Sequence, residues 1–476
     1  MIDIGSNSVR LVVYGVEGAS LVSLFDEKAM CGLGRGLSET GKLHPDGRVS
    51  AIAELRRFAQ VAADEEPDAI FPFATSAVRD ASDATDFVDA VKAATGFDIE
   101  IISGLEEARL AAEGVAGAVP GATGLVGDLG GGSLELVWLE NGLVRDQATL
   151  PIGALRRDAG APVDTTAKWI DKGLKDIDWL PKCEGKPFYL VGGAWRAFAR
   201  AHMRQENYPL NVIHHYTMPA ASALELAEIF SMMSRRSAEL LETVSKKRRE
   251  IMPYAALVLA RVVRRAKPDS VIASAHGLRE GFVRDRFGAA NSDPLLDYCR
   301  RAGAASARIA PSGDVILSWV TPLFPKEDKA TLRLIEAACW LADTAGRDHP
   351  DRRAFIGYSR ALNLSSVALD HAGRGFLAAA VSCRYGGIPS NGQLDEARQL
   401  ASEEAITTAI RLGVVLRLAQ AISPTGKGLA RTGIELSADH LTLTGPEALL
   451  GGETVLRRLT AAAEIFGRQP LIAATS

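Results

Sequence analysis

Two short glycine-containing segments carry the residue types that could hold phosphate groups. Residues 3–12 read DIGSNSVRLV and residues 128–137 read DLGGGSLELV, so five of ten positions are identical. Backbone N–H groups in such turns form concave nests for phosphate oxygens, and glycine lets a phosphate approach the backbone closely. A leading aspartate can hold a hydrated Mg²⁺ or orient a water molecule. Two such turns facing each other are predicted to clamp an oligophosphate. The alternative is a pair of ordinary hairpins whose glycines serve geometry alone.

A second group of polar residues lies between these segments. Thr75, Ser76 and Arg79 follow an expected strand over 69–74, and they could present hydroxyls and a guanidinium to phosphate. This position after a strand end predicts that they contribute to the same phosphate site.

A pair of glutamates begins the next expected helix. Ser103 followed by Glu106 is typical of a helix capping box. Glu107 is not needed for that cap, and it is well placed to act as a general base for water. The competing explanation is the favourable placement of an acidic residue at a helix N-terminus.

The elements around these residues alternate between helix and strand. Apolar spacing and strong helix formers predict helices over 49–65 and 86–94, and strands are expected over 69–74 and 99–102. Such alternation indicates an α/β fold.

Length, charge and composition limit the classes of protein to which this chain can belong. The chain has 476 residues and a net charge of −4, which suggests about three domains and excludes a generally basic nucleic-acid binder. The sequence contains no uninterrupted apolar run of about 18 residues, so it predicts no membrane-spanning helix. No secretory signal is visible, and the five cysteines are scattered without a CxxC pair, so we expect a cytoplasmic protein. Met1 already lies in an expected strand, so we expect a few residues to precede it.

Seven motifs, in order, resemble the exopolyphosphatase / guanosine pentaphosphate phosphohydrolase family of the actin, sugar-kinase and heat-shock ATPase superfold. They are MIDIGSNSVRLVV, FATSAVRDA, IISGLEEARLAAEGV, VGDLGGGSLELV, LPIGALR, YLVGGAWRAFAR and SAHGLREGF. The resemblance implies two ribonuclease-H-like α/β lobes with a cleft between them, at 1–119 and 120–288. A helical HD-like domain at 289–425 and a small α+β domain at 426–476 would follow.

The resemblance also implies residue roles. It places the first phosphate loop on Asp3, Gly5, Ser6, Asn7 and Ser8. It places the second on Asp128, Gly130, Gly131, Gly132 and Ser133. Glu107 would activate water, Asp128 and Glu135 would associate with the metal, and Arg79, with Thr75 nearby, would contact phosphate. Arg10 occupies the place of Glu135 in the first repeat, so the two hairpins are not equivalent.

Two further segments permit more than one interpretation. Ten basic and four acidic residues between 235 and 269 give a local net charge of +6. Lys246, Lys247, Arg248 and Arg249 within it would guide a polyphosphate tail, or the segment is a solvated helical surface. The Gly192-Gly193 turn could serve polyphosphate, adenosine or only helix packing. His214 and His215 lack a spaced carboxylate or cysteine and are not expected to bind metal.

The C-terminal third is expected to be mainly helical, over 296–308, 329–345, 352–361, 374–385 and 395–422. Where an HD enzyme has its His-Asp pair, this chain reads Leu341-Ala342-Asp343, and only His349 and Asp370-His371 remain. We therefore expect a non-catalytic region that extends the polyphosphate groove or forms a dimer interface. Alternation over 433–436 and 440–444 predicts a hairpin.

The leading functional hypothesis is a Mg²⁺-dependent exopolyphosphatase that releases orthophosphate from the ends of inorganic polyphosphate, with Glu107 activating water. The runner-up is hydrolysis of guanosine pentaphosphate. An ATP-binding kinase or chaperone-like module of the same superfold and a polyphosphate-binding protein that hydrolyses poorly also remain. A homodimer is expected, with no nucleic-acid partner.

Overall fold

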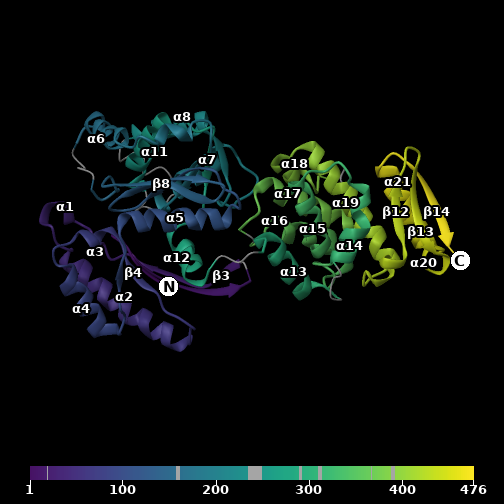
Figure 1. Ribbon diagram of the computed structural model, residues 1–476, viewed down its shortest axis with the longest axis horizontal. Coiled ribbons are helices and arrows are strands. Elements are labelled where there is room, and N and C mark those ends of the chain that lie inside the picture. Colours follow the sequence, from purple (N-terminus) through teal and green to yellow (C-terminus); the bar gives the residue numbers. More distant parts are fainter. Residues whose placement is uncertain are drawn as a thin grey trace. The chain divides into compact units, whose positions relative to one another are not determined.

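The computed structural model describes residues 1–18, 20–156, 161–233, 249–288, 292–308, 313–365, 367–387 and 392–475. It has a mixed α/β fold with two compact units (Figure 1). The first comprises residues 1–17 and 21–290, and the second comprises 18–20 and 291–476.

The first sheet of the first unit has the strand order β3-β2-β1-β4-β5. Its strands are β1 (Ile2–Ile4), β2 (Val9–Glu17), β3 (Ser20–Ala29), β4 (Pro72–Ala74) and β5 (Glu100–Ile101). Strand β1 is central, antiparallel to β2 and parallel to β4. Polar loops that follow β1 and β4 are therefore brought side by side.

Helices α2 (Pro45–Asp64) and α4 (Ala84–Thr95) pack on this first sheet, and Phe58 and Phe87 are fully buried there. They confirm the helices predicted over 49–65 and 86–94. Helix α2 begins earlier than expected because Pro45 occupies its first turn, where a missing N–H costs nothing. Two short helices, α1 (Leu37–Thr40) and α3 (Ser76–Asp80), complete this part.

The second sheet has the order β10-β11-β9-β6-β7-β8. Its strands are β6 (Gly124–Leu129), β7 (Leu134–Glu140), β8 (Leu143–Leu150), β9 (Phe188–Val191), β10 (Thr217–Pro219) and β11 (Ser270–Ala273). Figure 1 shows helices on both faces of this sheet. They are α6 (Val163–Lys175), α7 (Gly193–Gln205), α8 (Ala220–Ser231) and α11 (Met252–Ala266) on one face and α5 (Gly104–Ala118) on the other, with a 3₁₀ turn at Leu180–Cys183.

Helices α5 and α12 (Leu278–Phe287) pack tightly against each other. A Cβ on Gly281 would lie 1.8 Å from the Leu110 carbonyl oxygen, so only glycine permits this approach. Phe282 of α12 stacks on Phe73 of β4 with ring centroids 4.9 Å apart. Residues 278–287, which the expected boundaries assign to the second lobe, therefore also pack on the first sheet.

The second unit is mainly helical. Its helices are α13 (Pro294–Ser306), α14 (Gly313–Val320), α15 (Lys329–Leu341), α16 (Arg353–Leu362), α17 (His371–Arg384), α18 (Asp395–Leu400) and α19 (Glu403–Ile422), with 3₁₀ turns at Thr321–Leu323, Pro350–Arg352 and Lys427–Arg431. Helix α14 was not expected. The single helix predicted over 395–422 is wrong: the chain is extended at Ser402, whose hydroxyl accepts a hydrogen bond from the Ala405 N–H and starts a new helix.

Among the described residues, α19 is the one helix whose length and apolar composition would allow it to cross a membrane. However, 61% of its apolar stretch is buried inside the structure. That burial is typical of a helix at the core of a folded unit.

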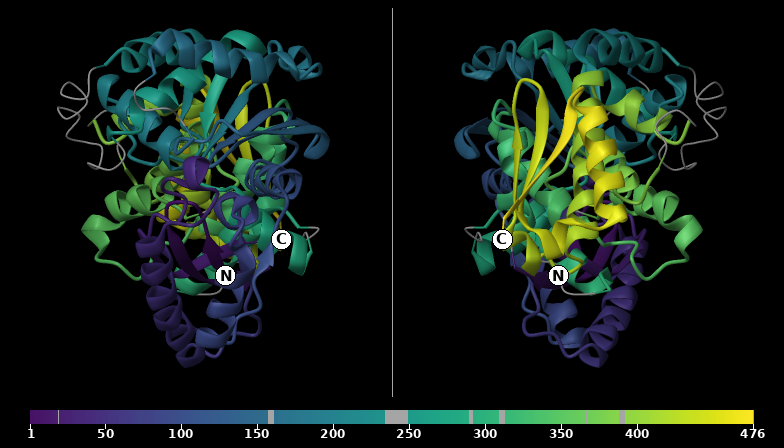
Figure 2. Two further views of the ribbon diagram at one scale, coloured as in Figure 1. Left: turned by 90° about the vertical axis from the view of Figure 1, so that its left-hand side faces the viewer. Right: turned by 90° about the vertical axis from the view of Figure 1, so that its right-hand side faces the viewer.

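A three-stranded sheet, β12-β13-β14, ends the second unit. Strands β12 (Gly433–Leu436) and β13 (His440–Pro446) form the expected antiparallel hairpin. Strand β14 (Gln469–Thr475) adds to it in parallel, after α20 (Glu447–Leu450) and α21 (Glu453–Ile465). Figure 2 shows α21 beside this sheet.

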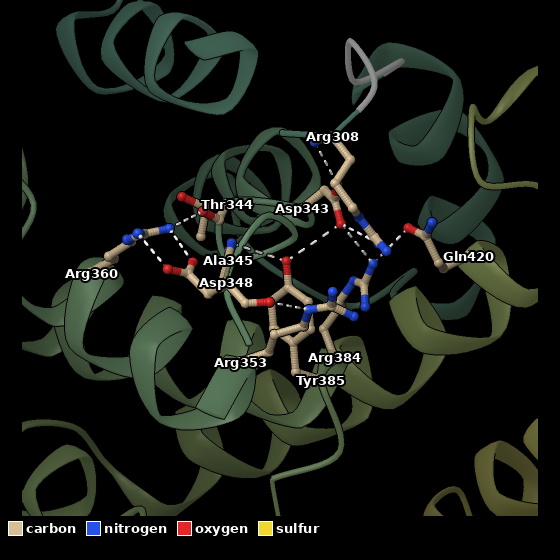
Figure 3. Close-up of polar contacts among 10 residues, drawn as sticks. All are labelled: Arg308, Asp343, Thr344, Ala345, Asp348, Arg353, Arg360, Arg384, Tyr385 and Gln420. Atoms are coloured by element: carbon tan, nitrogen blue, oxygen red, sulfur yellow. Dashed lines mark hydrogen bonds and ion pairs between the residues drawn. The ribbon is translucent and has the colours of Figure 1, made fainter. Parts of the chain in front are cut away.

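Figure 3 shows the environment of Asp343 in the second unit. Its carboxylate accepts hydrogen bonds from Arg308, at 2.7 Å from Nη2, and from Arg384, at 3.2 Å. Burial would raise the pKa of Asp343, but Arg308 and Arg384 lower it overall. His349 lies exposed, and Asp370 caps α17 by accepting a hydrogen bond from the Gly373 N–H. The carboxylate of Asp343 is thus neutralised by arginines.

Candidate active site

The two similar sequence segments have the same local structure. In each, a strand leads into a turn closed by one backbone hydrogen bond, from Gly5 N–H to Ser8 O and from Gly130 N–H to Ser133 O, both 3.0 Å long. The following strand then pairs antiparallel with the first. The predicted duplication is therefore present in three dimensions.

The strand register explains how the duplicated hairpins differ. Asp128 lies directly opposite Glu135, and Asp3 lies directly opposite Arg10. Residues opposite each other in a ladder project from the same face, so Asp128 and Glu135 share a face, as the sequence allowed. One hairpin thus pairs two acids and the other pairs an acid with a base.

Each turn is held by a glycine-containing loop that follows its hairpin. Gly34 N–H donates to Ser6 O at 2.8 Å, and Leu155 N–H donates to Gly131 O at 2.7 Å. These bonds use the carbonyl groups of the turns and leave their amides available. In the part of the chain that the structure describes, the N–H groups of Ser6, Asn7, Gly131 and Gly132 have no hydrogen-bond partner. Both turns can therefore offer amides to an anion.

A cleft of about 640 Å³ in the first unit contains both turns. The expected residues that line it are Asp3, Gly5, Ser6, Asn7, Ser8, Thr75, Glu107, Asp128, Gly130 and Gly131. Glu135 is buried behind it, at 1% exposure. Arg79, Gly132 and Ser133 line smaller pockets beside it.

The residues expected to guide a polyphosphate tail are not brought into the cleft by the described structure. Lys246, Lys247 and Arg248 lie outside the described residues, and Arg249 is not among the residues that line the cleft. Their role stays a prediction.

The two turns meet where the cleft adjoins a smaller pocket of about 230 Å³. Ser6 Oγ and Ser76 Oγ are hydrogen-bonded at 2.9 Å. A Cβ on Gly132 would lie 2.4 Å from Ser76 Oγ, and one on Gly131 would lie 3.0 Å from Ser6 Cβ. The glycines therefore allow the second turn to close against the first.

Gly153 supports the second turn from behind, and Gly153→Ala is expected to disrupt it. The new Cβ would lie 2.2 Å from Gly132 C and 2.3 Å from Ser133 N, so backbone must shift. We expect a loss of about 1–3 kcal/mol in the free energy of unfolding and weaker phosphate binding. Denaturant unfolding and phosphate-release assays measure both effects.

Gly173→Ala is the matched control. This helical glycine has Leu150 as its nearest neighbour, at 3.6 Å, and alanine there should be neutral or stabilising. Equal stability of Gly153→Ala and Gly173→Ala would contradict the role given to Gly153.

Glu107 is positioned by the first turn of α5. Ser103 Oγ accepts a hydrogen bond from Glu106 N–H at 3.1 Å, as a helix cap does. The Glu106 side chain turns to Arg109, 2.6 Å away, so it does not complete the expected capping box. Glu107 points inward, at 7% exposure, and lines the cleft.

Arg79 holds Glu107 in place. Its Nη1 donates to Glu107 Oε2 and to the Ile102 carbonyl, both at 3.0 Å. In the structure, Arg79 contacts Glu107, the candidate base. A contact between Arg79 and phosphate stays a prediction.

Burial raises the pKa of three carboxyl groups here. It raises that of Glu107 to about 7, against the opposing effect of Arg79, and that of Asp128 to about 6. The pKa of Glu135 lies well above its ordinary value because of burial and the nearby Glu107 and Asp128. Thr149 donates to Glu135 Oε1 at 3.1 Å, whereas Oε2 is buried without a partner. Closely spaced carboxylates with an orphaned oxygen are suited to a cation.

Two arginines that were not predicted as site residues also line the cleft. Arg279, at the start of α12, donates from Nη1 to Asp3 Oδ2 at 3.1 Å. Burial would lower its pKa, but Glu280 and Asp3 raise it overall, so the guanidinium stays charged. Arg196 of α7 donates to the Ala275 carbonyl at 2.9 Å. Both lie in the family-like motifs SAHGLREGF and YLVGGAWRAFAR, and these motifs are the sequence signal for the two arginines.

The Gly192-Gly193 turn also belongs to the cleft. Gly192 has φ 99°, and a Cβ there would lie 2.8 Å from Leu129 O and 3.0 Å from Asp128 Oδ1. Glycine is therefore required for this turn to pass beside Asp128.

Known proteins are similar to this chain in sequence and in fold. Residues 12–289 match the model of the Ppx/GppA phosphatase family, and residues 321–472 match that of the exopolyphosphatase C-terminal region. "Exopolyphosphatase 2" of Mycobacterium tuberculosis is 27% identical over 307 residues, covering 59% of this chain and 96% of that protein. "Exopolyphosphatase 1" of Mycobacterium leprae is 27% identical over 301 residues, covering 60% and 87%.

Solved structures show the same fold. The Ppx/GppA family member of Aquifex aeolicus has a TM-score of 0.52 at 24% identity and covers 61% of this chain and 98% of its own. An exopolyphosphatase of Cytophaga hutchinsonii has a TM-score of 0.55 at 20% identity and covers 60% and 96%. Because the first family model spans more than half of the 476 residues, this chain belongs to the Ppx/GppA phosphatase family, as its motifs predicted.

Proposed function

We propose that this protein is an exopolyphosphatase that hydrolyses the terminal phosphoanhydride bond of inorganic polyphosphate and releases orthophosphate. One observation carries the proposal: the buried carboxylate of Glu107 lines the same cleft as two duplicated turns with available amides. The names of the curated relatives, which are exopolyphosphatases, support this substrate.

In this mechanism the chain's own groups bind the phosphates and activate water. Amides of the two turns hold the terminal phosphates, and Arg279 and Arg196 offset their charge. Glu107 orients a water molecule for in-line attack on the terminal phosphorus and accepts its proton. Arg79 keeps the carboxylate directed at that water. The bond from the terminal phosphorus to the bridging oxygen breaks, and the shortened chain keeps that oxygen.

Asp128 and Glu135 would hold Mg²⁺. Mg²⁺ is usually bound by one or two carboxylates together with substrate phosphates and water. The described residues contain no group of three or more metal-ligating side chains, so the two acids, with the unpartnered Glu135 Oε2, suit that mode of binding. When bound, the ion would neutralise charge on the transferred phosphoryl group.

Metal binding should raise thermal stability more at alkaline than at acid pH. The folded-state pKa values of Glu107, Asp128 and Glu135 are raised, so these groups destabilise the metal-free fold once pH exceeds their ordinary values. In EDTA, the Tm should fall as pH rises from about 5 to about 8, and Mg²⁺ should offset the fall. Differential scanning fluorimetry measures this, and we expect a Mg²⁺ gain of at least about 2 °C at the higher pH.

Asp128→Asn and Glu135→Gln should each reduce the Mg²⁺-dependent gain in Tm. Glu113→Gln is a suitable control, since Glu113 pairs with Arg109 and does not line the cleft. An equal gain in all four proteins would contradict the metal assignment.

The function is tested by comparing orthophosphate release from long-chain polyphosphate and from guanosine pentaphosphate, with Mg²⁺ and with EDTA. Faster release from polyphosphate supports the proposal. A fast pentaphosphate rate with negligible polyphosphate hydrolysis would instead favour guanosine pentaphosphate phosphohydrolase, the runner-up. Phosphate transfer from ATP to an acceptor without hydrolysis would favour a kinase.

A further inference from the structure

The narrow part of the cleft at Ser6 and Ser76 raises the question of how the product leaves. Ser6 and Ser76 are joined there, and Gly131 and Gly132 pack against them. If the terminal phosphate is cut at this point, the rest of the chain still fills the cleft between the product and the open side. Orthophosphate must then wait for the chain to dissociate or leave by another route.

A side pocket of about 250 Å³ offers that route. Among the residues that line it are Arg79, Asp80, Ser133, Thr149, Pro151 and Arg156. Arg79 lines this side pocket and also donates to Glu107, which lines the cleft. One guanidinium therefore stands between the candidate base and the side pocket.

The chemistry of the side pocket suits a small phosphate anion. Arg79 and Arg156 supply two guanidinium groups, which bind phosphate well. Ser133 Oγ is buried without a hydrogen-bond partner and can donate to a phosphate oxygen. These groups line the side pocket together with Arg79.

An ion pair forms part of the wall of the side pocket. Arg156, which follows β8, pairs with Asp80 at the end of α3, and their side chains are 30% and 32% exposed. Exposed pairs of this kind contribute little to stability, so this contact can open.

We propose that orthophosphate leaves through the side pocket, passing Arg79 and Arg156, while the shortened polyphosphate stays in the cleft. This inference rests on the proposed function and deepens it, since it explains how one chain could be cut repeatedly without release. It involves no covalent change: the product moves from one set of guanidinium and hydroxyl partners to another.

Pro151→Trp tests the exit, because Pro151 is exposed and lines the side pocket. Orthophosphate release from long chains should fall by about tenfold as product escape becomes limiting. Gels should show a ladder of intermediate lengths where the wild type shows few. Hydrolysis of tripolyphosphate should stay near the wild-type rate, because its pyrophosphate remnant dissociates and frees the cleft after each cut.

Two further variants separate the exit from structural damage. Leu143→Trp places the same side chain on an exposed position of β8 and should leave both rates unchanged. Adding Arg156→Ala to Pro151→Trp should widen the side pocket and restore most of the long-chain rate.

Equal losses on long and short substrates, or unchanged long-chain turnover, would overturn the exit. A ladder of intermediate lengths from the wild-type protein would also overturn the proposed exit, because it would show that the polyphosphate chain dissociates after each cut. Absence of phosphate release from every polyphosphate would contradict the proposed function itself, and the exit with it.

Discussion

Glu107→Gln is expected to lower kcat for orthophosphate release by about 10²–10⁴-fold, the usual contribution of a positioned general base. Glutamine keeps the size and can still accept a hydrogen bond from Arg79, 3.0 Å away, so the cleft should keep its shape. The amide cannot accept the proton of the attacking water. KM for polyphosphate should therefore change little, and steady-state kinetics with Mg²⁺ separate the two parameters.

The pH profile provides a second readout of the same residue. Burial raises the pKa of Glu107 to about 7, and a base must be ionised to act. Wild-type kcat should rise as pH increases through this region, and the rise should be lost in Glu107→Gln.

Glu106→Gln is the matched control, one residue earlier in the same helical turn. Its side chain contacts Arg109 and does not line the cleft, so kcat should stay near the wild-type value. Wild-type turnover in Glu107→Gln would show that another group activates the water.

Arg279→Ala should have the second-largest effect, on binding and on stability. The guanidinium holds Asp3 at 3.1 Å with side chains only 16% and 17% exposed, and it lines the cleft. Its loss leaves Asp3 without this partner and removes a positive charge from the phosphate path. We expect up to about 3 kcal/mol of lost stability and a fall of about 10²-fold in kcat/KM.

Arg286→Ala controls for the loss of an arginine from the same helix. Its ion-pair partner is Glu100, with both side chains well exposed, and its guanidinium lies over the Phe282 ring. Removing it should cost about 1 kcal/mol or less and should not change phosphate release. Phosphate-release kinetics and urea unfolding of both variants measure the effects. If the kcat/KM of Arg279→Ala matches that of Arg286→Ala, Arg279 does not contact the phosphate chain.

The sequence predicted the turns better than it predicted their surroundings. The duplicated hairpins were visible because glycine, serine and aspartate recur at fixed positions, and local hydrogen bonds such as Gly5 to Ser8 enforce that geometry. The sequence allowed Asp128 and Glu135 to share a face but did not require it, because the register of the two strands depends on the whole hairpin.

Contacts between segments that are far apart in the chain could not be predicted from the sequence. Arg279 reaches Asp3 from the other end of the first unit's chain, and Arg79 of α3 reaches Glu107 of α5 across the intervening α4 segment of the sequence. Neither pair has a local spacing signal. The break at Ser402 was missed for another reason: helical apolar spacing runs across it, and the cap that starts α19 is a single side-chain bond.

The hydroxyl contact between Ser6 and Ser76 has a consequence for which molecules can be cut. Because this contact narrows the passage between the cleft and a smaller neighbouring pocket, a free terminus should fit there better than the middle of a polyphosphate chain. Cyclic phosphates such as trimetaphosphate have no terminus, so they should resist this protein even though their anhydride bonds are the same.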